Sequence, residues 1–424
     1  MRALLFWLFL SIPTLMVAQP DYNTYFENKS LRFDFLLGGN HKDVFVYPAG
    51  IKQEPYWAGN RTNLIDPLNY GTYRFRVFDL NSDSLIFSKG FCTLFQEWQT
   101  TAEAKKIDKT YYQAAIIPFP KKDIRLEIEA RQWNGEFKTI YTTNIDPQNY
   151  FITKESTEDY TTKAILDNGK PEKKVDIVIL AEGYTVNEKQ KFFGDATRVS
   201  NYLFDEEPFK SEKANFNIRA VFTPSVESGT DIPGEQIYKN TAFNSSFYTF
   251  DLPRYLTTSD MKNIYDAASM VPYDHIYILV NTDRYGGGGF YNFVTVCTAD
   301  NDRTRQVFIH EFGHGFAGLG DEYYNSSVAY EDYYNLEIEP WEANLTTLVD
   351  FDSKWKKMIE ASTPIPTPRT EEYSNTIGAF EGGGYMTEGI FSPKMDCRMK
   401  SNESEGFCPV CEDAIRKVIR YHVE

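Results

Sequence analysis

The chain has 424 residues, of which 42% are hydrophobic and 16% aromatic, so it can bury a sizeable core and is long enough for two domains. Its formal net charge is -16. This charge argues against nucleic acid or anionic lipid as a partner, because both require clustered lysine and arginine.

The first 18 residues have the layout of a signal peptide. Arg2 precedes an apolar run from Ala3 to Leu10, and the small residue Ala18 stands where cleavage would occur. The run is too short to cross a bilayer, and no later apolar stretch is long enough. We therefore expect a protein without a membrane span that is secreted, periplasmic or held at the cell surface.

Residues 19–151 alternate between apolar and polar side chains and are rich in aromatic residues. In the run Ile124 to Arg131, apolar residues fall on one face and charged residues on the other, which is typical of a half-buried antiparallel strand. Turn signals such as Asn134-Gly135 separate such runs. The pattern predicts an all-β sandwich, and because it holds no catalytic cluster we expect an accessory domain.

Residues 152–174 are polar and predict a linker, after which the pattern changes. Val175 to Leu180 is a continuous apolar run suited to a strand covered on both faces, and Asn187 to Phe204 has helical periodicity. Further strands are expected at Phe216 to Phe222 and His275 to Asn281. The order predicts an α/β/α domain with a mainly parallel sheet over residues 175–424.

A glycine run, Gly286 to Gly289, precedes another apolar segment, Phe290 to Cys297. In a protease, an exposed strand edge here could pair with an extended substrate backbone. A plain hairpin loop explains the run equally well.

The segment His310-Glu311-Phe312-Gly313-His314 carries two of the chain's five histidines, four residues apart. On a helix this spacing puts both imidazoles on one face, where they can bind zinc, while Glu311 can act as general base on water. The alternative is a buried helix with core histidines. Four glycines in and after this segment disfavour it, since each lowers helix propensity: Gly313, Gly315, Gly318 and Gly320.

A catalytic zinc site needs three protein ligands and an open position. Gly318 can end the helix in the left-handed conformation and turn the chain back, so we expect Asp321 as the third ligand and Glu322 as a residue that orients a histidine ring. Glu322 as the ligand is the alternative. Tyr385 and Tyr323 are candidates for stabilising the oxyanion, although the chain has 29 tyrosines.

Five cysteines leave at least one unpaired within an exported chain. Cys397, Cys408 and Cys411 lie close in sequence, and a disulfide between two of them is the expected arrangement. A zinc site there would need a fourth ligand, for which His422 is the candidate. The other two, Cys92 and Cys297, are expected to be buried thiols.

The long motif HEFGHGFAGLGDEY (residues 310–323), with VDIVILAEGY (175–184) and SVESGTD (225–231), resembles the M64 metallopeptidases, often labelled IgA peptidases. The resemblance covers residue 175 to the C-terminus, and the β domain is similar to that family's N-terminal domain. It implies one catalytic zinc ion and a metzincin-like fold in which Met399 lies in a turn beneath the zinc.

The chain departs from the common metzincin pattern. Gly318 and Asp321 stand four and seven residues after His314, rather than three and six, and there is no third histidine.

Three functions remain open at this stage. The leading one is an exported zinc endopeptidase that acts on a protein or glycoprotein. The others are an adhesion or glycan-binding protein with a structural metal, and a zinc amidase that acts on glycan or cell-wall material. Nothing in the sequence indicates the cleavage specificity or the oligomeric state.

Overall fold

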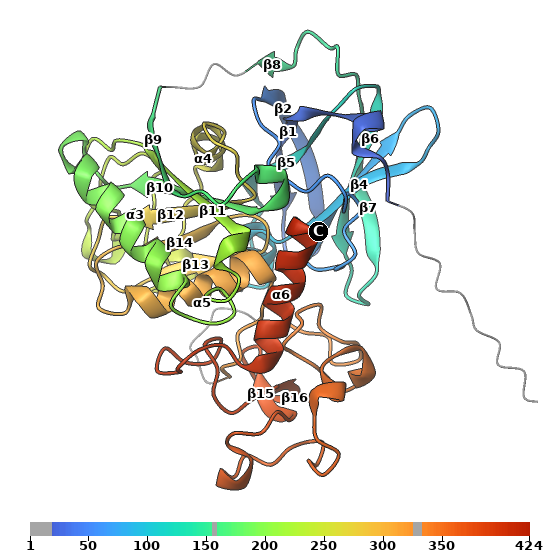
Figure 1. Cartoon of the computed structure of the whole chain (residues 1–424), viewed down its shortest axis with the longest axis vertical. Coiled ribbons are helices and arrows are strands. Elements are labelled where there is room, and N and C mark those ends of the chain that lie inside the picture. Colours follow the sequence, from blue (N-terminus) through green and yellow to red (C-terminus); the bar gives the residue numbers. More distant parts are fainter. Residues whose placement is uncertain (1–18, 155–158, 325–332) are drawn as a thin grey trace, which may run out of the picture.

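The computed structural model describes residues 19–154, 159–324 and 333–424. The predicted signal peptide, residues 1–18, lies outside these ranges. The chain forms an N-terminal domain, drawn in blue and cyan, beside a second domain in green, yellow and light orange (Figure 1). Most of the darker orange and red residues form a lobe below both, from which the last helix rises between the domains. No helix in the described ranges is long and apolar enough to span a membrane.

The N-terminal domain consists of two four-stranded sheets that share one apolar core. Apart from a parallel β2–β8 pair, the strands in both sheets are antiparallel. Phe35 of one sheet meets Phe75 of the other edge-on, with ring centroids 6.4 Å apart. The first sheet has the order β5-β1-β2-β8: β1 (Phe26–Gly39), β2 (Val44–Glu54), β5 (Lys109–Pro120) and β8 (Thr153–Lys154). The second has the order β4-β3-β6-β7: β3 (Tyr73–Asp79), β4 (Leu85–Phe91), β6 (Ile124–Arg131) and β7 (Phe137–Ile145).

Two short helices complete this domain, α1 (Tyr22–Tyr25) and α2 (Leu94–Gln99). The alternating run that predicts a strand forms β6, whose residues Leu126 and Ile128 are fully buried. The two-domain organisation expected from the sequence is confirmed.

The second domain is built on a six-stranded mixed sheet. Its four central strands are parallel, and an antiparallel strand lies at each edge. In spatial order the strands are β13 (Gly287–Gly289), β14 (Thr295–Thr298), β12 (His275–Val280), β10 (Val175–Glu182), β11 (Phe216–Phe222) and β9 (Thr161–Leu166). Strand β9 lies where the sequence predicts a linker, because its β-branched residues pair with β11 despite their polar neighbours.

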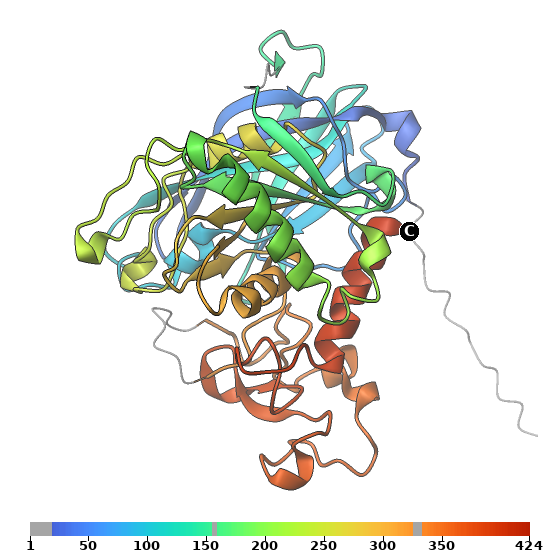
Figure 2. The ribbon, with the colours of Figure 1, turned by 60° about the vertical axis from the view of Figure 1, so that its left-hand side comes forward.

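Side chains alternate across the fully buried strand β10 and enter two cores. Ile177 and Ile179 pack with α3 (Lys189–Leu203), α5 (Thr304–Ala317) and α6 (Pro409–Val423). Figure 2 shows α3 and α5 side by side on this face. Val178 and Leu180 enter the opposite core with α4 (Met261–Ala268), and Leu94 and Ala114 of the N-terminal domain belong to the same core. The N-terminal domain therefore covers one face of the second domain's sheet.

A buried arginine joins the two domains. Arg32 of β1 pairs with Asp34 (2.9 Å) and Glu54 (3.1 Å) in its own domain and with Asp266 of α4 (2.5 Å) in the other. Asn60 also donates to two carbonyl oxygens in the last turn of α6, at 3.1 and 2.9 Å. The domains thus meet through buried polar contacts as well as a shared apolar core.

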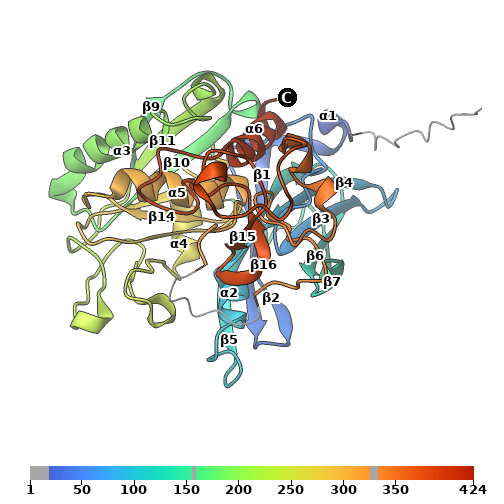
Figure 3. The same ribbon diagram turned by 90° about the horizontal axis from the view of Figure 1, so that it is seen from below.

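The lobe below the two domains carries a two-stranded sheet, β15 (Phe380–Gly383) and β16 (Met386–Ser392). Figure 3, seen from below, shows this hairpin in front of the junction between the domains. The chain then runs from the lobe into α6, which packs against α5.

Candidate metal centre

Helix α5 carries both histidines and ends where the sequence predicts. Gly318 adopts the left-handed conformation, with φ of 61°, and its N–H donates to the carbonyl oxygen of His314 (3.0 Å). A Cβ at this position would lie 2.7 Å from Trp341, so a larger residue would be both strained and crowded. The turn carries the chain back along the helix, as far as Asp321.

His310, His314 and Asp321 come together at this turn. The Asp321 Oδ1 atom lies 3.1 Å from His310 Nε2 and 3.3 Å from His314 Nε2, and the two Nε2 atoms are 3.1 Å apart. Of the two carboxylates that the sequence offers as third ligand, the structure brings Asp321 to the histidines.

The other ring nitrogens define what this cluster can bind. His310 Nδ1 is 2.9 Å from the carbonyl oxygen of Arg398, and His314 Nδ1 is 2.5 Å from that of Leu319. Because carbonyl oxygens only accept, both Nδ1 atoms donate, and in the neutral rings both Nε2 atoms are lone-pair donors to a metal. Asp321 Oδ1 is buried and has no hydrogen-bond partner among the described residues. Two imidazole nitrogens and a carboxylate oxygen facing one point fit a zinc ion.

Charge interactions within the cluster favour a bound cation. Burial lowers the pKa of His314, but the Asp321 carboxylate outweighs burial and raises that pKa to about 9. Burial likewise opposes ionisation of Asp321, yet the two histidines hold its pKa well below the ordinary value. Burial also raises the pKa of Glu311, so this carboxylate takes up a proton more readily than an exposed glutamate.

The Glu322 side chain does not orient a histidine ring, contrary to the prediction. Its Oε1 atom accepts from Asn344 (3.0 Å) and from the thiol of Cys411 (3.2 Å). Main-chain carbonyl oxygens orient both rings instead. Adjacent residues at an extended turn point in opposite directions, so Asp321 and Glu322 face different clusters.

Met399 lies beneath the histidine helix. A Cβ added to Gly313 would lie 2.8 Å from Met399 Sδ, so this glycine allows the methionine to approach the helix closely. The carbonyl oxygen of Met399 accepts from the backbone N–H of Glu322 (2.8 Å), which ties the methionine segment to the turn after α5.

Tyr385 lies at the cluster, and its hydroxyl donates to Asp321 Oδ2. Its backbone N–H donates to the carbonyl oxygen of Tyr323 (3.0 Å), and the two tyrosine rings lie 5.5 Å apart. Both tyrosines predicted as candidates therefore line the same cleft. The Tyr385 hydroxyl holds the carboxylate of Asp321 in this structure.

The cleft also contains residues that the sequence analysis does not identify. Arg254 lines it beside Glu311, and helix α2 of the N-terminal domain contributes Glu97, which accepts a hydrogen bond from the Tyr255 hydroxyl. No local pattern marks Arg254. The N-terminal domain is thus part of the cleft wall.

The glycine run expected to be a loop forms a short strand, β13, at the edge of the sheet, and the apolar segment after it becomes a strand only at β14. A Cβ on Gly287 would lie 3.0 Å from Glu311 Cγ, so β13 runs directly beside helix α5. Gly287 also forms a bridge with Tyr255, which occupies part of the edge that a substrate backbone could use.

The expected disulfide is not formed, since all five cysteines are free. Cys397 Sγ and Cys411 Sγ are 3.7 Å apart, whereas a disulfide bond measures about 2.05 Å. His422, the predicted fourth ligand of a zinc site at these cysteines, instead packs against His275 and Phe316. Cys92 and Cys297 are buried thiols, as expected.

Comparisons with known proteins identify the family of the chain. The family described as IgA Peptidase M64 matches residues 164–376 and 369–419, and the Peptidase M64 N-terminus matches residues 21–142. A search of curated proteins finds no match. The matched ranges cover most of both domains, and the chain belongs to the IgA peptidase M64 family.

Proposed function

We propose that the protein is an exported zinc-dependent endopeptidase with a metzincin-like catalytic domain. The observation that carries the proposal is the convergence of His310 Nε2, His314 Nε2 and Asp321 Oδ1 in a cleft beside Glu311. These three residues would hold the ion. Met399 beneath the helix supports the metzincin comparison.

A bound zinc ion would supply Lewis-acid chemistry, polarising the scissile carbonyl and activating water. Glu311 is the general base: it takes a proton from the attacking water and passes it to the leaving amine. Burial raises the pKa of Glu311, which favours proton uptake by this carboxylate. Arg254, in the same cleft wall, is placed to stabilise negative charge on the substrate oxygen or to bind a substrate carboxylate.

The substrate class is protein or glycoprotein. Strand β13 offers main-chain groups next to Glu311, except where Tyr255 bridges Gly287. An extended peptide could pair with the remaining part of this edge and place its scissile bond near the catalytic residues.

The test compares Glu311→Gln with wild type on a mixed protein pool, with cleavage sites identified by mass spectrometry. We expect the variant to keep its zinc and to lose activity about 10²- to 10⁴-fold, the range for a general base. Glu412→Gln, an acid-to-amide change at an α6 residue that does not line the cleft, is the matched control and should remain active. Chelation by EDTA should abolish cleavage in both wild type and control.

Two outcomes would contradict the proposal. Full activity of Glu311→Gln would remove the general base. Absence of any peptide cleavage, combined with glycan binding that survives EDTA, would support the adhesion function, whereas release of amide-linked groups from glycan or cell-wall material would support the amidase.

A further inference from the structure

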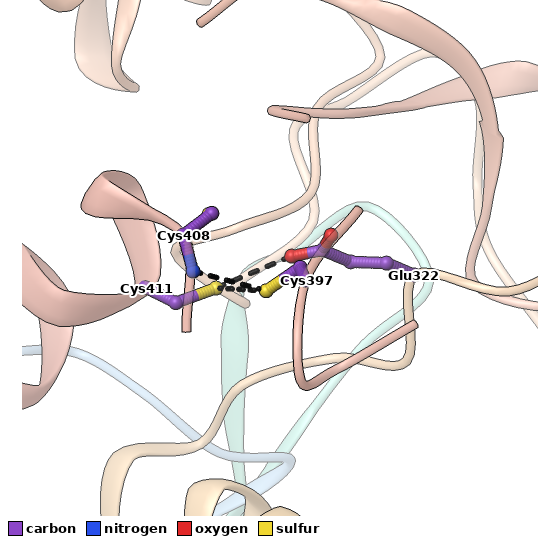
Figure 4. A group of neighbouring side chains, drawn as sticks. All are labelled: Glu322, Cys397, Cys408 and Cys411. Carbon is purple, nitrogen blue, oxygen red and sulfur yellow. Dashed lines mark hydrogen bonds between the residues drawn. The ribbon is translucent and has the colours of Figure 1, made fainter. Parts of the chain in front are cut away.

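A second cluster of metal-binding side chains lies behind the candidate catalytic site. It consists of Cys397, Cys408, Cys411 and Glu322. Figure 4 shows the sulfur atoms of Cys397 and Cys411 beside the Glu322 carboxylate, with the backbone nitrogen of Cys408 next to Cys397. All four are buried, and their sulfur and carboxylate oxygen atoms lie within 4.8 Å of one another. No motif in the sequence joins Glu322 to the cysteines, because 75 residues separate it from Cys397.

The distances match metal coordination better than a disulfide. Cys397 Sγ and Cys411 Sγ are 3.7 Å apart, and Cys411 Sγ is 3.2 Å from Glu322 Oε1. Two sulfur atoms bound to one tetrahedral zinc ion, each at about 2.3 Å, lie roughly 3.8 Å apart. Cys408 and Cys411 also have the two-residue spacing common in structural zinc sites, and both lie at the start of α6.

The Glu322 carboxylate needs a positive partner that the surrounding residues do not provide. Its Oε2 atom is buried and has no hydrogen-bond partner among the described residues. The nearby Lys400 ammonium donates instead to the main-chain oxygen of Glu322, at 2.9 Å. A buried carboxylate beside three thiols is costly unless a cation compensates it. Thiolate ligands select a soft or borderline metal such as zinc.

We propose that Cys397, Cys408, Cys411 and Glu322 bind a structural zinc ion, separate from the ion at the histidines. Four protein ligands would close the coordination shell, which is typical of a structural site rather than a catalytic one. The ion would join three segments: the turn after α5, the segment before Met399 and the start of α6.

This site would position the catalytic residues. Glu322 directly follows Asp321, and Cys397 stands two residues before Met399. A zinc ion that holds Glu322 would fix the direction of the neighbouring Asp321 carboxylate. The same ion, by holding Cys397, would fix how closely Met399 packs beneath α5. The proposal does not depend on the catalytic function, because a metal count tests it directly.

The experiment measures zinc content and thiol state in the full-length protein. We expect two zinc ions per chain in wild type, one in the double variant Cys408→Ser/Cys411→Ser and one in His310→Ala/His314→Ala. Cys297→Ala, a change at a buried thiol outside the cluster, is the matched control and should retain two. X-ray absorption at the zinc edge of wild type should show about three sulfur ligands for every two zinc ions, and the thiol count after denaturation in chelator should be five.

Wild type alone decides the matter if the cysteine variant does not fold. A single zinc ion per chain with no sulfur ligand would overturn the proposal. So would a disulfide-linked peptide that joins any two of the three cysteines in the unreduced protein.

Discussion

Replacing Tyr385 with phenylalanine separates two roles for this residue. The hydroxyl donates to Asp321 Oδ2, so its removal leaves a buried carboxylate oxygen without that donor. Hydrogen bonds to charged groups contribute about 1.5–3 kcal/mol, which corresponds to roughly a 10- to 100-fold weaker affinity for the catalytic zinc. The direction follows because a less firmly held carboxylate is a poorer ligand.

The assay is chelator competition for zinc, combined with kcat and KM for a cleaved peptide. Tyr334→Phe is the matched control, because the Tyr334 hydroxyl donates to Glu342 (3.0 Å) rather than to Asp321. If zinc affinity is unchanged while kcat falls about 10²- to 10³-fold, Tyr385 instead stabilises the oxyanion. That result would refute the assignment of the hydroxyl to Asp321.

Three further predictions concern stability. Gly318→Ala should lower the free energy of unfolding by at least about 1–2 kcal/mol and weaken zinc binding, because φ is 61° and Trp341 leaves no room for a Cβ. The control is Gly194→Ala on α3, where the space is open and the change should stabilise by about 0.5–1 kcal/mol. Equal effects of the two changes in urea denaturation would contradict this. Arg32→Met leaves buried carboxylates without their cation, so the free energy of unfolding should fall by about 3–5 kcal/mol in the same assay. A decrease under about 1 kcal/mol would show that the arginine does not hold the domains together. Burial lowers the pKa of His422 to about 3, whereas a histidine in the unfolded chain has a pKa of about 6.5. As pH falls, the unfolded chain therefore takes up the proton first. The stability that the neutral, buried His422 contributes is complete above about pH 6.5 and is lost as pH falls toward 3. His422→Gln should therefore flatten the pH dependence of stability by up to about 1.4 kcal/mol per pH unit between roughly pH 6 and 4, and parallel curves for variant and wild type would contradict it.

The sequence predicts those parts of the site that local geometry determines. The spacing of His310 and His314 places both rings on one face of any helix, and Gly318 permits a left-handed turn that returns Asp321 to them. The strand Val175 to Leu180 is equally clear, since a fully apolar run of that length fits a strand covered on both faces.

Other features depend on contacts between distant segments. The direction of Glu322 is set by a hydrogen bond from Cys411, 89 residues later, and Arg254 reaches the cleft from an irregular loop without a recognisable pattern. Strand β9 looks like a linker because the residues around it are polar, and only pairing with β11 makes it a strand. These features need the folded chain, because no single stretch of sequence encodes them.

The shared core between the domains limits how this protein can be divided. Leu94 and Ala114 fill the same apolar layer as Val178 and Leu180, so a fragment that begins at β9 would expose that layer to water and self-associate. Since α2 also contributes Gln96 and Glu97 to the cleft wall, substitutions there would reshape the cleft without any change in α5.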